Sequence, residues 1–115
     1  MLGAGPAFAG TDARARAGTP VQWYADGMFV SHGDSLTVCD TYGDGRRAYA
    51  EITYRPSPHG SEITRTVEDA NGANNGKCAS EGGDIAEGTG VVLKVCVRNG
   101  SGGALEECNA DWGSA

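Results

Sequence analysis

The sequence predicts an all-β fold: an antiparallel β-sandwich of the Ig-like or Greek-key kind, with about seven or eight short strands and two disulfides. Short apolar segments alternate with polar residues at a period of two, and turn residues separate these segments. The 19 glycines among 115 residues exceed the usual share of about 7% and follow no regular period. Four cysteines are available to staple the sheets. These features indicate one small domain built from strands and tight turns.

The segment from Gly90 to Gly100 is the clearest strand. It is the longest apolar run of the chain and has a glycine at each end. β-Branched residues dominate it, as is typical of strands. Alternate residues of a strand point to opposite faces, so one face carries Val91, Leu93, Val95 and Val97. We expect this strand to be central, with the other strands packed around it.

Further strands are expected wherever a similar alternation lies between turn residues. Their ranges are Val21–Tyr24, Met28–Val30, Ser35–Asp40, Arg46–Arg55, Ser61–Asp69, Asp84–Glu87 and Ala104–Cys108. Residues 25–27 are expected to form a turn between the first two. Arg65 falls on the inward side of its strand, which indicates either a strand at a sheet edge or one whose core face is short. Trp112 is expected to lie against the edge of the sandwich.

The residues before the first expected strand divide into two segments. Residues 1–9 contain Ala7-Phe8-Ala9, the small-x-small pattern of a signal-peptidase site, and are interpreted as the remnant of a signal peptide. Residues 10–19 show no apolar period and are expected to form a flexible arm. Residues 20–115 would then form the single folded domain.

The four cysteines allow three pairings. We favour Cys39–Cys78 and Cys96–Cys108, because the second pair would tie two sequential strands across their hairpin. The first pair would hold an early strand to the long loop before the central strand. A zinc site is disfavoured because no two cysteines are close in sequence, and disulfides in turn favour an extracellular protein.

The sequence offers no complete catalytic set, so the protein is not expected to be an enzyme. The block Gly33-Asp34-Ser35-Leu36 matches the short signature of GDSL esterases, but the late Asp-x-x-His that such enzymes need is absent. Glu106 and Glu107 are adjacent on a strand and would point to opposite faces. No cofactor is expected. The loops Asp40–Asp44 and Asp69–Asn74 keep calcium as an alternative, although neither has the EF-hand spacing.

The net charge and the aromatic residues indicate which classes of binding partner are favoured. The formal net charge is −6, which disfavours nucleic acid and anionic membranes. No apolar run approaches the roughly 20 residues of a membrane-spanning helix. Exposed aromatic residues on a sandwich can anchor a protein or stack on a sugar ring. The expected contact residues are Val21, Trp23, Tyr24 and Tyr49, of which Tyr49 is expected to face solvent.

A resemblance to a known group rests on the cysteines, on Asp40, on Asp44-Gly45 and on the last two strands. Within residues 34–112 the pattern V-C-D-T, then G-D-G-R-R-A-Y, then V-x-L-K-V-C-V followed by a cysteine and a tryptophan, resembles small secreted β-proteins of Streptomyces and related actinobacteria. The resemblance implies a secreted protein with the fold predicted above. Some proteins of this kind are similar to adaptor subunits of secreted assemblies such as the umbrella toxin particles, and others inhibit extracellular proteases.

We therefore expect a secreted, non-enzymatic protein-binding or adaptor domain whose partner is another secreted protein. The segment 10–24 is a candidate for donating a strand to that partner. One alternative is a protease inhibitor that presents the loop 56–60 or the loop before Cys78. A further alternative is a carbohydrate-binding module that uses Tyr49 and neighbouring aromatic residues.

Overall fold

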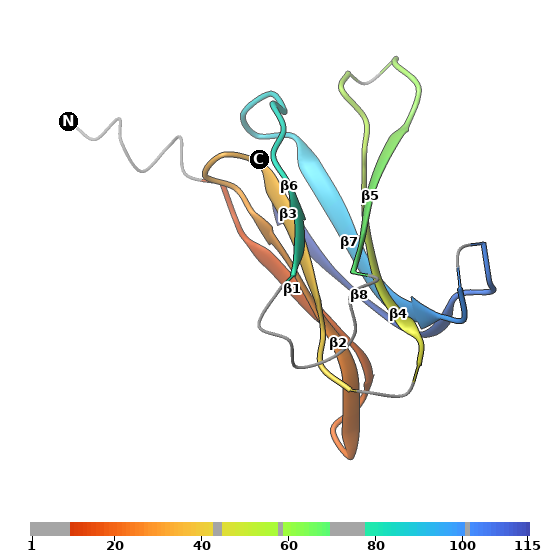
Figure 1. Cartoon of the computed structure of the whole chain (residues 1–115). Coiled ribbons are helices and arrows are strands. Elements are labelled where there is room, and N and C mark those ends of the chain that lie inside the picture. Colours follow the sequence, from red (N-terminus) through yellow and green to blue (C-terminus); the bar gives the residue numbers. More distant parts are fainter. Residues whose placement is uncertain (1–9, 43–44, 58, 70–77, 101) are drawn as a thin grey trace.

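The computed structural model describes residues 10–42, 45–57, 59–69, 78–100 and 102–115, and these residues form two antiparallel sheets with no helix (Figure 1). The expected signal-peptide remnant, residues 1–9, lies outside the described residues. The strands are β1 (Ala13–Thr19), β2 (Gln22–Val30), β3 (Ser35–Asp40), β4 (Arg47–Tyr54), β5 (Ile63–Asp69), β6 (Ala79–Glu81), β7 (Gly90–Arg98) and β8 (Glu106–Ser114). The predicted antiparallel β-sandwich is confirmed.

Each sheet has four strands, in the orders β1-β2-β3-β6 and β5-β4-β7-β8. β7 lies between β4 and β8, so the prediction of a central strand is confirmed. Its four alternating apolar residues are buried, and they meet the buried faces of the neighbouring strands. The largest fully buried side chains of the core are Phe29, Leu36, Ile52, Leu93, Val38, Val91, Val95 and Val97.

Strand β1 corrects the expectation of a flexible arm at residues 10–19. It pairs along its whole length with β2, and its alanines Ala13, Ala15 and Ala17 are buried. The alternation of alanine with Arg14 and Arg16 is a period-two pattern, but alanine has a low strand propensity and so hides it. Residues 13–19 therefore form a strand because their small side chains are buried between the two sheets, despite the low strand propensity of alanine.

Strand β2 is continuous where a turn was expected at residues 25–27. Gly27 lies in mid-strand, and a Cβ at this position would collide with the side chain of Val95 on β7. The glycine is therefore needed because the facing sheet approaches closely, and it does not mark a turn. Sequence reasoning cannot distinguish these two uses of glycine from one chain alone.

Three further differences concern the second half of the chain. Residues 84–87 form no strand, and the short β6 precedes them, although Ile85 still enters the core. β8 continues past Cys108 to Ser114, beyond an irregularity of the β7–β8 register that includes Glu107 at φ 56°. Trp112 therefore lies within β8 with 68% of its surface exposed, so the expected packing against the sandwich edge is wrong.

Both disulfides form as predicted. Cys39–Cys78 joins β3 to the residue that precedes β6, and Cys96–Cys108 joins the neighbouring strands β7 and β8. The described part of the chain contains no free cysteine. The two bonds thus act on opposite sheets.

The two sheets meet along one side in what we call the closed seam, between β1 and β8. Thr11 and Ser114 exchange backbone hydrogen bonds of 3.0 and 2.9 Å. Farther along, Asp111 accepts a hydrogen bond from the backbone N–H of Arg14 at 3.0 Å. The side chain of Asn109 donates to the carbonyl oxygens of Arg16 and Gly18 at 2.8 and 2.9 Å. Side chains of β8 therefore satisfy backbone groups on the outer edge of β1.

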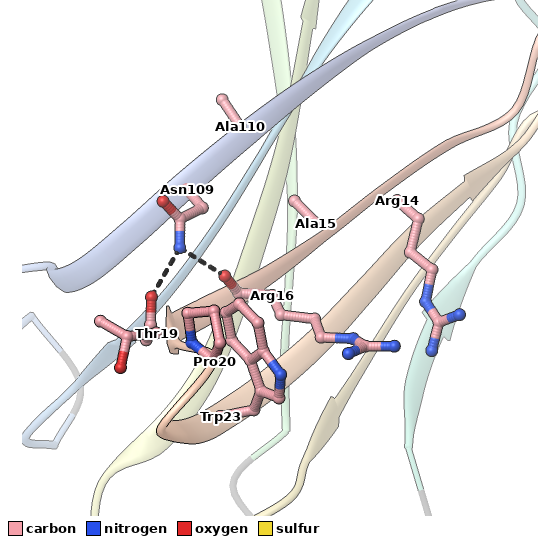
Figure 2. A pocket seen from close by; sticks show the side chains of 9 residues that line it. Arg14, Ala15, Arg16, Thr19, Pro20, Trp23, Asn109 and Ala110 are labelled. Atoms are coloured by element: carbon pink, nitrogen blue, oxygen red, sulfur yellow. Dashed lines mark hydrogen bonds between the residues drawn. The ribbon is translucent and has the colours of Figure 1, made fainter.

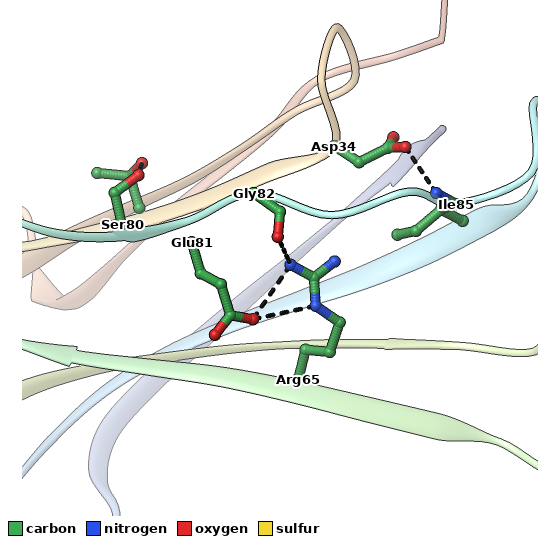
Figure 3. Close-up of polar contacts among 7 residues, drawn as sticks. Asp34, Arg65, Ser80, Glu81, Gly82 and Ile85 are labelled. Atoms are coloured by element: carbon green, nitrogen blue, oxygen red, sulfur yellow. Dashed lines mark hydrogen bonds and ion pairs between the residues drawn. The ribbon is translucent and has the colours of Figure 1, made fainter.

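The opposite side, which we call the open seam, lies between β5 and β6. Among the described residues, no backbone hydrogen bond joins these two strands. The guanidinium of Arg65 reaches across from β5 instead and contacts Glu81 at 3.2 Å and the carbonyl oxygen of Gly82 at 2.7 Å (Figure 3). β5 is an edge strand, which is one of the two alternatives that the position of Arg65 indicated.

Candidate functional site

The turn between β1 and β2 forms one end of the molecule, which we call the hairpin end (residues 19–23) (Figure 1). Val21 at its tip is 93% exposed, the highest exposure among the large hydrophobic residues that the structure describes. Two hydrogen-bonded strands hold this apolar tip, so presenting it to a partner would order little additional chain. A single exposed aliphatic residue is common on protein surfaces, so Val21 becomes a candidate contact only together with its apolar neighbours Pro20 and Trp23.

A groove of about 610 Å³ lies on one side of the hairpin end (Figure 2). Most of its lining comes from β1 and β8, which are far apart in the sequence, and Pro20 and Trp23 of the hairpin end complete it. The lining residues are Arg14, Ala15, Arg16, Gly18, Thr19, Pro20, Trp23, Asn109 and Ala110. This groove, which we call the β1–β8 groove, contains two arginines and no acidic residue.

A smaller groove of about 330 Å³ lies next to the first. It shares Arg16, Pro20 and Trp23 with the β1–β8 groove and adds Val21 and Asp26, among others. The Trp23 side chain and the Arg16 side chain therefore line both hollows. A partner that covered the hairpin end would contact these two residues from either side.

Arg16 and Trp23 contact one another directly. The guanidinium carbon of Arg16 lies 5.5 Å from the centre of the Trp23 ring, which is a cation–π distance. Arg14, the second arginine of the groove, is bound to Asp26 of β2 at 2.6 Å. The ion pairs of the described residues do not include Arg16. Arg16 is therefore the arginine of the groove that forms no ion pair among the described residues, because Asp26, its cross-strand neighbour on β2, is paired with Arg14.

Asn109 fixes the wall of the groove. Its two hydrogen bonds to Arg16 and Gly18 hold β1 against β8 where the β1–β2 register shifts. Gly18 has φ +111°, and a Cβ there would collide with the carbonyl oxygen of Gln22. This position therefore requires glycine, and the resulting bulge aims the strand end toward the hairpin tip.

Only two of the four predicted contact residues lie close together on the surface. Val21 and Trp23 lie at the hairpin end. Tyr24 instead packs against the core, with Tyr42 edge-on at 5.4 Å and Arg46 over its ring at 4.7 Å. The sequence did not single out Arg16, although its alternation with alanine could have placed it on an outward strand face.

Tyr49 corrects the expectation of an exposed aromatic residue. It lies on the outer face of β4 but is only 9% exposed, because Arg98 covers its ring at 5.0 Å. Its hydroxyl donates to Glu51 at 2.8 Å, and Glu68 in turn binds Arg98. Burial, followed by the hydrogen bond to Glu51, raises the pKa of Tyr49 to about 12. This residue is a structural element and offers no open ring face.

Trp112 is the exposed aromatic residue on that outer sheet face. The register of β5-β4-β7-β8 aligns one residue from each strand in a row across the sheet: Thr64, Thr53, Val92 and Trp112. Val92 is itself 37% exposed. This row forms a second, flatter surface, and the sequence missed it because β8 was expected to end before Trp112.

Several described residues that were considered for metal or catalytic chemistry make structural contacts. In the described ranges, no group of three or more His, Cys, Asp or Glu residues could hold a metal ion. Asp40 and Asp69, at the bases of the two loops considered for calcium, are adjacent, with the backbone N–H of Asp40 donating to Asp69 at 3.1 Å. Residues 43–44 and 70–77 of those loops lie outside the described residues.

Two further candidate residues, Asp34 and Glu106, make similar contacts. Asp34 of the GDSL-like block accepts a hydrogen bond from the backbone of Ile85 at 2.7 Å, which fastens the segment after β6 to the β2–β3 hairpin (Figure 3). Glu106 pairs with Arg46 at 3.0 Å. Both acidic residues thus connect separate parts of the chain.

Comparisons with known proteins do not identify a function for these surfaces. Within the part of the chain that the structure describes, no helix is long and apolar enough to cross a membrane. Searches of protein-family models, curated proteins and solved structures found no match to the chain. The function is therefore argued from the hairpin end and the two grooves beside it.

Proposed function

We propose that the protein is a secreted, non-enzymatic binding domain of the adaptor type, and that it attaches to another extracellular protein through the hairpin end. The observation that carries this proposal is the 93% exposed Val21 beside two grooves that share Trp23. Two disulfides in a small domain favour an oxidising compartment, and they support the extracellular part of the proposal. An adaptor in a larger secreted assembly, such as a toxin particle, needs this kind of rigid contact surface.

The mode of contact differs from strand donation by a free arm. Residues 13–19 already pair with β2, and side chains of β8 satisfy backbone groups on their outer edge. Insertion of the hairpin end into a partner leaves these bonds intact. Burial of one fully exposed valine side chain contributes about 1.5–3 kcal/mol, and a buried tryptophan beside it would make the usual kind of binding hot spot.

The test compares Val21→Asp with Trp112→Ala in capture experiments. The tagged full chain would be incubated with culture fluid of the producing organism, and the retained proteins identified and quantified by mass spectrometry. We expect Val21→Asp to lose a stoichiometric partner that wild type retains. Trp112→Ala removes another exposed hydrophobic residue, which lies on β8 and is 68% exposed, and this variant should retain the partner. A partner held equally by wild type and Val21→Asp would refute the hairpin end as the binding surface.

Carbohydrate binding is a second candidate, because Trp112 is 68% exposed and aligned with Val92 and two threonines. An exposed indole on a flat sheet face can stack on a sugar ring. The same two variants decide this candidate in a retention assay on chitin, cellulose and peptidoglycan. Retention lost in Trp112→Ala but kept in Val21→Asp would support the candidate. The absence of any retention would remove it.

A further inference from the structure

The β1–β8 groove has a charge opposite to that of the whole protein. The chain has a formal net charge of −6, yet the lining of this groove holds Arg14 and Arg16 without an acidic residue. Asp26, which neutralises Arg14, lines only the smaller groove. A local positive site on an acidic protein attracts a negatively charged ligand group and orients it during encounter.

The position of Arg16 limits how a ligand can use the groove. Its guanidinium lies over the Trp23 ring, so a sugar ring cannot stack on that ring face. An arginine held against an aromatic ring loses little further side-chain freedom on binding, and its N–H groups match the two oxygens of a carboxylate. The groove is therefore suited to a carboxylate group that sits beside an apolar contact.

The surroundings of Arg16 favour a peptide over an acidic polysaccharide. Pro20, Trp23 and Val21 form an apolar margin at the hairpin end, which suits aliphatic or aromatic side chains better than the hydroxyl-rich surface of a sugar chain. Ala15 and Ala110 continue this apolar lining along the groove. The ligand must therefore carry a negative charge close to an apolar group. An acidic peptide segment meets this need, because neighbouring residues of one chain can supply the carboxylate and the apolar side chain.

We infer that the β1–β8 groove binds an extended acidic segment of the partner protein, with an aspartate or glutamate carboxylate on Arg16 and an apolar side chain against Trp23 and Pro20. This inference rests on the proposed function and adds the chemistry of the partner. Arg16 provides charge selectivity within the groove, and Val21 provides apolar contact at the adjoining hairpin end. The two contributions can be removed separately, so they can be tested separately.

The first stage is selection of displayed random dodecapeptides on the immobilised full-length protein. We expect the enriched peptides to be rich in Asp or Glu next to an apolar residue. An enriched peptide would be synthesised both as selected and with its acidic residues changed to the matching amides. Affinity would be measured by tryptophan fluorescence in a Trp112→Phe background, in which Trp23 is the remaining indole.

The second stage is a double-mutant cycle with Arg16→Gln. We expect the amide peptide to bind wild type about tenfold more weakly, as for loss of one charge-assisted contact. Arg16→Gln should weaken binding of the acidic peptide by a similar factor. The two changes together should weaken it no further, because both remove the same contact. Arg55→Gln makes the same change in net charge outside the groove and should leave affinity unchanged.

The outcomes separate this inference from the proposed function. Loss of binding in Val21→Asp, with no effect of Arg16→Gln or of the amide peptide, would keep the hairpin end as the contact surface and overturn the acidic ligand. Binding unaffected by all three changes would count against both. Failure to enrich any peptide would overturn the inference, as would Arg16-dependent binding of polygalacturonate in place of peptides. Thermal unfolding of Arg16→Gln beside Arg16→Lys checks that each variant is folded.

Discussion

The two sides of the sandwich are joined in different ways. At the closed seam, β1 and β8 share a backbone bridge and further hydrogen bonds from Asn109 and Asp111 to the backbone of β1. At the open seam, one arginine side chain joins β5 to β6. The closed seam also forms the wall of the β1–β8 groove. The surface proposed for binding is thus built on the better-connected side, where preorganisation lowers the cost of binding.

The open seam depends more on covalent linkage. β6 has only three residues, so its backbone ladder to β3 is short, and it is supplemented by the Cys39–Cys78 disulfide and by a 2.8 Å hydrogen bond between Thr37 and Ser80. Arg65 then connects this short strand to β5. Without the disulfide, β6 would be held to β3 by this three-residue ladder and the Thr37–Ser80 hydrogen bond. The two seams therefore predict different responses to mutation.

The largest expected effect follows removal of the open-side disulfide with Cys39→Ala and Cys78→Ala. The bond spans a sequence separation of 39, so loop-closure entropy gives a loss of about 4 kcal/mol in the free energy of unfolding. The Cys96–Cys108 bond spans 12 and should contribute about 3 kcal/mol on the same basis. Denaturant unfolding of both double variants measures these losses.

Hydrogen exchange locates the effect of the same variants. Amides of β3 and β6 should lose protection without Cys39–Cys78, whereas those of β1 and β8 should keep theirs. Equal loss of protection at both seams would show that the two sides unfold as one unit. That result would contradict the comparison.

A smaller difference is expected between Asn109→Ala and Arg65→Met. Asn109→Ala removes two hydrogen bonds to the backbone of β1, and we expect a loss of about 1–2 kcal/mol in the free energy of unfolding. Arg65→Met removes an ion pair to the half-exposed Glu81 and a hydrogen bond to the exposed carbonyl of Gly82, and the loss should stay below about 1 kcal/mol and shrink at high salt. A larger effect of Arg65→Met would reverse the assignment of the stronger seam.

The smallest effect concerns pH and the outer face of β4. The folded-state pKa of Tyr49 is raised to about 12, above the ordinary value of about 10. The stability that neutral Tyr49 contributes is therefore complete below about pH 10 and is lost as the pH rises toward 12. Ultraviolet titration should show one tyrosine ionising last, and Glu51→Gln should lower its pKa. An unchanged late tyrosine in Glu51→Gln would show that burial alone determines the shift.

Patterns that depend on large side chains were predictable from the sequence. β3, β4, β5 and β7 follow an apolar alternation, and their positions agree with the expected ranges to within a few residues. Both disulfide pairings were also predicted. The predictions were wrong at two places where the two sheets approach closely. One is β1, with its buried alanines, and the other is Gly27, which faces Val95. A single sequence does not show that two sheets come close enough to need small residues.

The candidate site was predicted only in part for a related reason. Val21 and Trp23 were expected as contact residues and lie together at the hairpin end. Arg16, Asn109 and Ala110 were missed, because their proximity depends on the closed seam between distant strands. Tyr49 was expected to be exposed from strand alternation, but a neighbouring arginine covers it. Alternation gives the face of a sheet and does not say what lies over that face.

The closed seam also has a consequence for the order of events in folding. Its hydrogen bonds join residues separated by 91 to 103 positions in the chain, so they form only after a large loop has closed. A chain arrested or cleaved between β7 and β8 would contain the β1–β2 hairpin but lack the β8 wall of the groove. Affinity for a partner would then be acquired in the last steps of maturation. An incomplete copy would be unable to occupy a partner's binding site through this groove.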